Sequence, residues 1–331
     1  MLISQILDEN GNQAVVVRSG SEASILKGVA STYDLVQEAI RKGQSLTECI
    51  RSHELGAAVD LERLAGEGRL LLPITHPDAA HMHLTGTGLT HLGSAATRDA
   101  MHAKAKDDEA NVTDSMKMFR MGLEGGRPDA GQVGVQPEWF YKGNGACAVA
   151  PGGELASPGF CDDGGEEPEV AGIYVIAEDG SPFRVGFALA NEFSDHVMER
   201  QNYLYLAHSK LRPASFGPEL LVGPLPERVE GTSRIYRDGA VLWEKPFLSG
   251  EANMSHTLAN LEHHHFKYEV FRQPGDVHVH MFGTATLSFA DGISCREGDE
   301  VEISAPGFGV PLKNRLAFRP SEAAAVQVKV L

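Results

Sequence analysis

The stretch IYVIAEDGSPFRVGFALA, residues 173–190, decides the fold class. Two apolar runs rich in β-branched and aromatic residues flank the turn dipeptide Asp179-Gly180, and this arrangement predicts an antiparallel hairpin. The same dipeptide recurs at Asp238-Gly239 between two alternating runs. The runs that continue the series are 234–237, 241–244, 277–282, 301–304 and 326–330. Short strands separated by turns predict a mostly antiparallel β architecture, a sandwich, roll or barrel, with helices near 114–123 and 255–270.

The beginning of the chain has a different pattern. After a predicted strand at 14–18, Ser31 precedes apolar residues at helical spacing that end at Gly43. A second helix start is indicated by the capping box Ser45-Leu-Thr-Glu48. We therefore predict an α+β, mostly β protein: a small N-terminal α+β domain over residues 1–72 and a larger domain over 73–331.

Composition and charge narrow the function classes. The 331 residues are 42% hydrophobic and 22% charged, which is typical of a globular protein, and 29 Lys and Arg against 45 Asp and Glu give a net charge of −16. Such an acidic surface repels phosphate backbones and anionic lipids, so neither nucleic acid nor membrane is an expected partner. The first residues lack a basic region and the four cysteines are scattered. These features predict a cytoplasmic protein.

An acidic cluster is the first candidate for chemistry. Glu167-Pro-Glu169 precedes a hydrophobic strand, and Asn191-Glu192 follows the next one. Carboxylates at positions i and i+2 of an extended chain point to the same face, and a third from a neighbouring strand completes an all-oxygen site for Mg²⁺ or Mn²⁺. The alternative is that residues 162–169 form a solvated acidic loop.

Lysines and histidines provide further candidates. Lys142 lies between an aromatic run and two glycines and could be a desolvated cation facing an anionic oxygen, or an ordinary strand-end lysine. Lys210 is a similar, weaker case. The pairs His81/His83 and His278/His280 suit one face of a strand, but no spacing rule places a third ligand, so a histidine metal site is not expected. The run 263–265 is interpreted as a helix surface.

An ordered set of motifs resembles the fumarylacetoacetate hydrolase family, from about Pro73 to Leu316. The motifs are Phe140-Tyr-Lys142-Gly, Glu167-x-Glu169, Gly186-Phe-Ala-Leu-Ala-Asn-Glu192-Phe-Ser-Asp195, Lys210 with Phe216-Gly-Pro, Gly283-Thr284, Glu297-Gly-Asp-Glu-Val-Glu302, Gly307-Phe-Gly and Asn314. The resemblance implies a mixed β-sandwich or β-roll catalytic domain and a homodimer.

The resemblance also assigns roles to residues. It implies that Glu167, Glu169 and Glu192 hold the metal ion, Mg²⁺ or alternatively Mn²⁺, although the family usually has Asp at the third place. The candidate catalytic residues are Lys142, Lys210, His91 and Thr284, and the candidate substrate contacts are Ser94, Asn191 and Thr284.

A departure from the family pattern points to one branch. The hydrolases have a water-activating histidine where this chain has Ser94, and His91 replaces a tyrosine. Together with Asn191-Glu-Phe-Ser-Asp195, this resembles the 2-keto-3-deoxy-pentonate dehydratases. The resemblance implies a Mg²⁺-dependent dehydratase that forms 2,5-dioxopentanoate from a small 2-keto acid, a 2-keto-3-deoxy-pentonate derived from D-xylonate or L-arabinonate. The alternatives are hydrolysis of a C–C bond in an acylpyruvate or 2,4-diketo acid, and a ligand-binding protein on an inactive fold.

Overall fold

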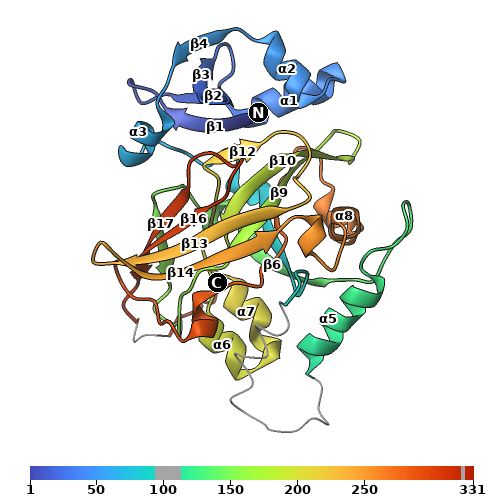
Figure 1. The fold of residues 1–331 in the computed structure, drawn as a ribbon, viewed down its shortest axis with the longest axis vertical. Helices are drawn as coiled ribbons and strands as arrows, with labels where there is room; N and C mark the ends of the chain where they lie inside the picture. The colour runs from blue at the N-terminus through green and yellow to red at the C-terminus, as the bar shows by residue number, and fades with distance from the viewer. Residues whose placement is uncertain (94–112, 322–324) are drawn as a thin grey trace.

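The computed structural model describes residues 1–93, 113–321 and 325–331, and it shows a mostly β protein built on two mixed sheets (Figure 1). Among the described residues, no helix is both long and apolar enough to cross a membrane. The predicted fold class, α+β with mostly β structure, is confirmed.

The first residues form an upper lobe of four strands and three helices, drawn in blue in Figure 1. These elements are β1 (Leu2–Leu7), β2 (Gln13–Ser19), β3 (Glu22–Leu26), α1 (Thr32–Lys42), α2 (Leu46–Ser52), β4 (Leu55–Ala58) and α3 (Leu61–Gly66). Ser31 caps α1, Gly43 ends it in a left-handed conformation, and the capping box of Ser45 and Glu48 begins α2, as predicted. The sheet of the lobe continues into the body because β1 pairs with β12, so the boundary at residue 72 stays a prediction.

The large sheet runs through both parts in the order β4-β3-β2-β1-β12-β10-β9-β15-β5-β6, with β11 paired to β10 and β7 paired to β11. Its strands in the body are β5 (Met82–Gly88), β6 (Glu138–Asn144), β7 (Ala148–Val149), β9 (Pro168–Ile176), β10 (Pro182–Asn191), β11 (Ala214–Phe216), β12 (Glu219–Leu221) and β15 (Val277–Met281). The hairpin predicted across Asp179-Gly180 is confirmed as β9–β10, and it occupies the centre of the sheet.

A second sheet has the order β14-β13-β16-β17-β8. Its strands are β8 (Glu154–Ser157), β13 (Val229–Arg237), β14 (Ala240–Ser249), β16 (Glu300–Ser304) and β17 (Leu312–Phe318). The α-helices of the body are α5 (Asp114–Gly125), α6 (His196–Gln201), α7 (Leu206–Lys210) and α8 (Leu258–Phe266), and the 3₁₀ helix η6 (Glu269–Phe271) follows α8. The hairpin at Asp238-Gly239 is confirmed as β13–β14, with both turn residues at positive φ.

Two predictions from pattern are wrong. The run 326–330 is exposed and forms no strand, because alternation alone does not provide a pairing partner. The run 263–265 is not simply a helix surface: His263 is exposed, but His264 and His265 are buried where α8 packs against the sheet.

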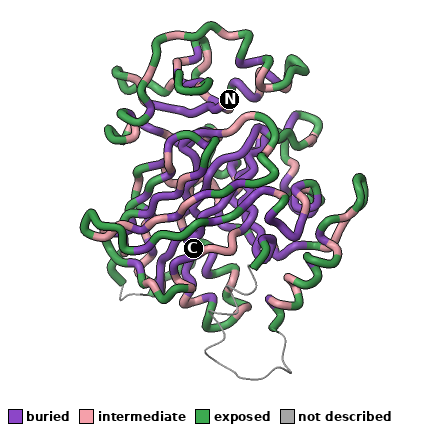
Figure 2. The backbone as a smooth tube through the Cα atoms, in the orientation of Figure 1, coloured by how far each residue is buried: buried purple, intermediate pink, exposed green. Residues whose placement is uncertain are grey.

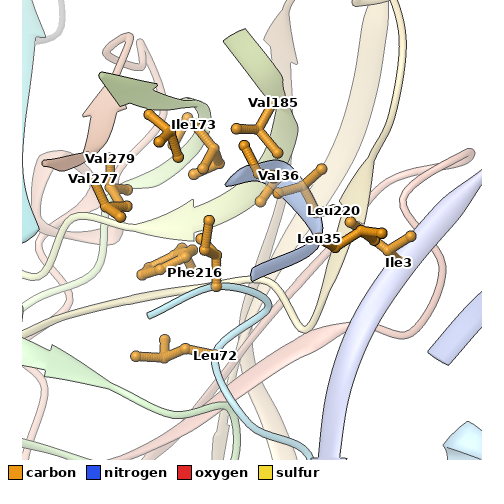
Figure 3. Close-up of a cluster of buried hydrophobic side chains, with 14 of the residues drawn as sticks. Ile3, Leu35, Val36, Leu72, Ile173, Val185, Phe216, Leu220, Val277 and Val279 are labelled. Carbon is orange, nitrogen blue, oxygen red and sulfur yellow. The ribbon is translucent and has the colours of Figure 1, made fainter. Parts of the chain in front are cut away.

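Consecutive residues of the central strands are buried, so both faces of these strands are covered. Figure 2 draws this part of the chain in purple. Ile173 and Val175 of β9 join a core that reaches α1 (Figure 3), whereas Val170 joins the core between the two sheets. Alternate side chains of one strand thus enter different cores. This double burial holds the ends of β9 and β10 in fixed positions, and the acidic cluster lies there.

The replacement Phe216→Ala should lower the free energy of unfolding by about 3–5 kcal/mol, since it empties a fully buried site. Chemical denaturation measures the change. Val328→Ala, in an exposed stretch, is the control and should change the stability by less than about 0.5 kcal/mol. A small loss for Phe216→Ala would contradict the close packing shown in Figure 3.

Candidate metal centre and active site

Three glutamates meet at the ends of the two central strands. Glu167 directly precedes β9, Glu169 lies on it, and Glu192 directly follows β10. Antiparallel pairing brings Pro168 opposite Asn191, and the backbone N–H of Glu192 donates to the Glu167 carbonyl at 3.0 Å. One carboxylate oxygen from each glutamate lies within 4.8 Å of the others. The spacing argument therefore correctly brought the three side chains together.

The alternative of a solvated acidic loop is wrong for this part of the sequence. Glu166, Glu167 and Glu169 are all buried, and Glu166 is hydrogen-bonded to Ser288 through both carboxylate oxygens. Buried charges need partners or a cation. The fold has therefore placed these acids where water cannot solvate them freely.

The donor set fits a hard divalent cation. Burial and the neighbouring Glu192 raise the pKa of Glu169 well above its usual value, and burial also raises that of Glu192. The Oε1 atom of Glu169 has no hydrogen-bond partner among the described residues, while its Oε2 accepts from the Gly283 N–H at 2.6 Å. Close carboxylates with a free oxygen are suited to Mg²⁺ or Mn²⁺, which prefer oxygen ligands.

Lys210 contacts two of these glutamates from the end of α7. Its Nζ lies 2.5 Å from Glu167 Oε1 and 3.1 Å from Glu192 Oε1, and it stands over the Phe140 ring at 5.2 Å. Burial by itself would raise the pKa of Glu167, but the charges and hydrogen bonds of Lys210 and His196 together outweigh it and hold this pKa below its usual range. Lys210 is therefore the cation placed directly beside the predicted metal ligands.

Lys142 contacts the backbone of Lys210 and lies outside the cavity lining. Its buried Nζ donates to the backbone carbonyls of Phe193 at 2.5 Å and Lys210 at 3.0 Å, and burial lowers its pKa to about 8. Lys142 is thus a buried lysine and not an exposed strand-end one, but it is not among the residues that line the cavity next to the glutamates, and its catalytic role stays a prediction. Its bonds instead fix the backbone that carries Lys210.

His196, on α6, was missed by the sequence analysis. Its Nε2 lies 3.0 Å from Glu167 Oε1, and its Nδ1 lies 3.7 Å from Asp163 Oδ2. Burial alone would lower its pKa, but these two carboxylates outweigh that effect and raise it to about 10. Glu199, three residues later on the same helix, also lines the cavity. Only the adjacent family motif ending at Asp195 could have signalled them.

The cavity next to the glutamates is small, with a volume of about 20 Å³. It is lined by Thr87, Gly88, Leu89, Phe140, Glu167, Glu169, Glu192, His196, Glu199, Lys210, Gly283, Thr284 and Leu287. Of the candidate catalytic residues, Lys210 and Thr284 are present and His91 is not.

The remaining candidates lie around the cavity or outside the described residues. His91 is buried, with Nε2 3.0 Å from Ser249 Oγ, and burial lowers its pKa to about 3. Asn191 contacts Glu167 through the backbone N–H of that residue, at 3.4 Å. Ser94 lies outside the described residues.

The buried histidines predict an acid limit to stability. Burial lowers the pKa of both His91 and His280 from 6.5 to about 3. Between these values the unfolded chain binds more protons than the folded protein, so stability falls as the pH drops below 6.5, by up to ~1.4 kcal/mol per pH unit for each group. Denaturant midpoints measured from pH 7.5 to 5 should show this fall, and His280→Asn should reduce its slope. A pH dependence that His280→Asn leaves unchanged would contradict the prediction.

Known proteins resemble this chain in sequence and in fold. No protein-family model matches the sequence. A probable 2-keto-3-deoxyxylonate dehydratase of Haloferax volcanii is 26% identical over 180 residues, which is 53% of this chain and 58% of that protein. The match thus spans less than two thirds of the relative.

Solved structures match almost the whole chain. The 2-keto-3-deoxy-D-arabinonate dehydratase complexed with magnesium and 2,5-dioxopentanoate has a TM-score of 0.70 at 19% identity, over 97% of this chain and 100% of that one. A 5-carboxymethyl-2-hydroxymuconate delta-isomerase from Mycobacterium smegmatis has a TM-score of 0.57 at 16% identity, over 96% and 100%. This chain therefore has the fold of these dehydratase and isomerase structures, as the resemblance of its sequence motifs implied.

Proposed function

We propose that this protein is a Mg²⁺-dependent dehydratase that converts a 2-keto-3-deoxy-pentonate to 2,5-dioxopentanoate. The observation that carries the proposal is the meeting of Glu167, Glu169 and Glu192 with Lys210 in one small buried cavity. The dehydratase complexed with magnesium and 2,5-dioxopentanoate supports the choice of reaction and ion, because its fold matches over nearly the whole chain.

The three glutamates would hold the cation, which when bound polarises the C1 carboxylate and C2 carbonyl of a 2-keto acid and so acidifies C3. Lys210 is the group of this chain best placed to remove the C3 proton, because it lines the cavity beside two of the ligands. It would act as the neutral amine, since a divalent cation held by the glutamates would take the place of its ammonium charge and so favour its uncharged form. The C4 hydroxyl departs with a proton as water, and the Thr284 hydroxyl is the neighbouring donor in the cavity. These losses leave a C3–C4 double bond. Removal of a C5 proton and protonation of C3 move the double bond to C4–C5, and the resulting enol takes a proton at C4 as its hydroxyl loses one, which gives the C5 aldehyde.

The roles of the other candidates follow from their places. Lys142 keeps Lys210 in position through its bonds to the backbone carbonyls of Phe193 and Lys210. The Asn191 side chain accepts from the Glu167 backbone N–H and so ties Glu167 to the end of β10, which Glu192 follows. A base for hydrolysis would have to activate water within hydrogen-bond reach of the carbonyl carbon, and His91 does not line the cavity.

A product assay tests the proposal. With Mg²⁺ and a 2-keto-3-deoxypentonate in heavy water, we expect 2,5-dioxopentanoate that carries deuterium in its carbon chain, since C3 and C4 exchange protons with solvent. Without the cation, product formation should stop. Acylpyruvates should react slowly or not at all. Rapid release of pyruvate from an acylpyruvate, with no dehydration product, would favour the hydrolase.

The proposal also covers the partners, the cellular location and the oligomeric state of the enzyme. The net charge of −16 favours small-molecule substrates over nucleic acid or membrane partners. The described cysteines are all free thiols, which suits a cytoplasmic protein. We expect a homodimer, and light scattering on the purified protein measures this directly.

A further inference from the structure

A second cluster of metal-ligating side chains lies outside the active site. His83, Asp276 and His278 each offer a ligand atom within 4.8 Å of the others. The parallel pairing of β5 and β15 places His278 opposite His83, and Asp276 lies two residues before His278 and so on the same face. His83 and His278 precede the cavity residues Thr87 and Gly283 by four and five positions, so the cluster lies at the other end of these strands.

The carboxylate of this cluster is already fixed. Asp276 is buried, its Oδ1 lies 2.8 Å from His81 Nδ1, and its Oδ2 lies 3.2 Å from His83 Nε2. The contact between His83 Nε2 and Asp276 Oδ2 has a length that two ligands of one small cation also have. His83 keeps about 17% of its side chain exposed, which leaves a path from solvent.

The third residue has an unused nitrogen. The Trp139 indole N–H donates to His265 Nδ1 at 3.2 Å, so the neutral His265 carries its proton on Nε2, 2.9 Å from His278 Nδ1. His278 therefore accepts at Nδ1, and its Nε2 is a fully buried polar atom with no hydrogen-bond partner among the described residues. A buried polar nitrogen without a partner is unfavourable, and moving its proton to Nδ1 frees the Nε2 lone pair for a cation.

We propose that His83, Asp276 and His278 form a zinc-binding site with a fourth position for water, separate from the carboxylate centre. Two imidazoles and one carboxylate are a ligand set that Zn²⁺ accepts, whereas Mg²⁺ prefers oxygen alone. The bound ion would join β5 to β15 directly and thereby stabilise the two strands that lead to the cavity.

Zinc binding has a consequence for the hydrogen bonds around it. When His278 Nε2 becomes a ligand, the ring proton moves to Nδ1 and donates to His265 Nε2. The proton of His265 then moves to its Nδ1. This nitrogen no longer accepts a hydrogen bond from the Trp139 indole, and the two N–H groups face each other. His83 likewise moves its proton to Nδ1, 3.4 Å from the Tyr141 hydroxyl. No proton is released from these rings, but the indole of Trp139 loses its acceptor.

The experiment uses Zn²⁺ as the probe, in wild type with excess Mg²⁺ and in the Glu169→Gln variant, whose carboxylate site is disabled. Calorimetry of this variant should show one Zn²⁺ per chain with a dissociation constant in the micromolar range. Wild type should show the same site, a higher melting temperature and a change in tryptophan fluorescence. The fluorescence change should vanish in Trp139→Phe while binding persists.

Two variants test the ligands. His83→Asn and His278→Asn should each weaken Zn²⁺ binding about 100-fold or more. His263→Asn removes an exposed histidine of α8 and is the matched control, with unchanged affinity. Because His83 is partly exposed, its variant should fold even where His278→Asn does not. Binding that is unaffected by His83→Asn, or absent from the micromolar range, would overturn the proposal.

Discussion

Glu169→Gln is expected to weaken Mg²⁺ binding on the order of 100-fold or more and to reduce turnover to background. The substitution keeps the size of the side chain, and its amide can still meet the Gly283 N–H through oxygen. It removes one of three carboxylates that burial and mutual repulsion already strain. Without metal the variant should therefore melt no lower than wild type, whereas the Mg²⁺-dependent rise in melting temperature should disappear.

The control is Glu262→Gln, which neutralises a half-buried acid of the body. Glu262 accepts from the Tyr174 hydroxyl at 2.9 Å and pairs with Arg184, and it does not line the cavity. Its variant should bind Mg²⁺ normally in calorimetry, whatever it does to stability. Normal Mg²⁺ affinity in Glu169→Gln would refute the metal assignment.

Lys210→Met should lower turnover by ~10²–10⁴-fold, the usual loss when a positioned proton-transfer group is removed. Mg²⁺ affinity should stay the same or increase, because the ammonium that competes for Glu167 and Glu192 is gone. Steady-state kinetics and calorimetry on the same preparation measure the two quantities separately. A loss of turnover that merely follows a loss of Mg²⁺ binding would argue against a role in proton transfer.

Lys142→Met tests whether Lys142 contributes to turnover by holding Lys210 in position. The substitution leaves the Phe193 and Lys210 carbonyls without their donor, at a cost of about 1–3 kcal/mol each. We expect a lower melting temperature and a turnover that falls more than Mg²⁺ affinity, since Lys210 shifts. Near-normal turnover would show that Lys142 is purely structural.

The sequence predicted most of what short-range patterns determine. Helix caps at Ser31 and Ser45 and the turn at Asp179-Gly180 depend on neighbouring residues, and the structure confirms them. The three glutamates could be grouped because strand periodicity and hairpin pairing together place them.

The parts that were missed depend on long-range contacts. His265 and His278 meet because α8 packs on the sheet, a contact that no spacing rule encodes. The different positions of the two lysines also depend on long-range contacts. Lys210 lines the cavity, whereas Lys142 donates to two backbone carbonyls. The strand predicted at 326–330 is the opposite case. The pattern is typical of a strand, but no neighbouring strand pairs with this segment.

The pairing of β1 with β12 has a consequence for handling the protein. Leu2, Ile3 and Ser4 cover one side of β12, whose other side meets β10 only at Phe187 and Leu221. In a fragment of residues 73–331, β12 would be an edge strand with unpaired N–H and C=O groups. Such edges pair with strands of other molecules. The upper lobe therefore prevents self-association by covering this edge. The fragment without residues 1–72 should aggregate and precipitate even if its active site is complete.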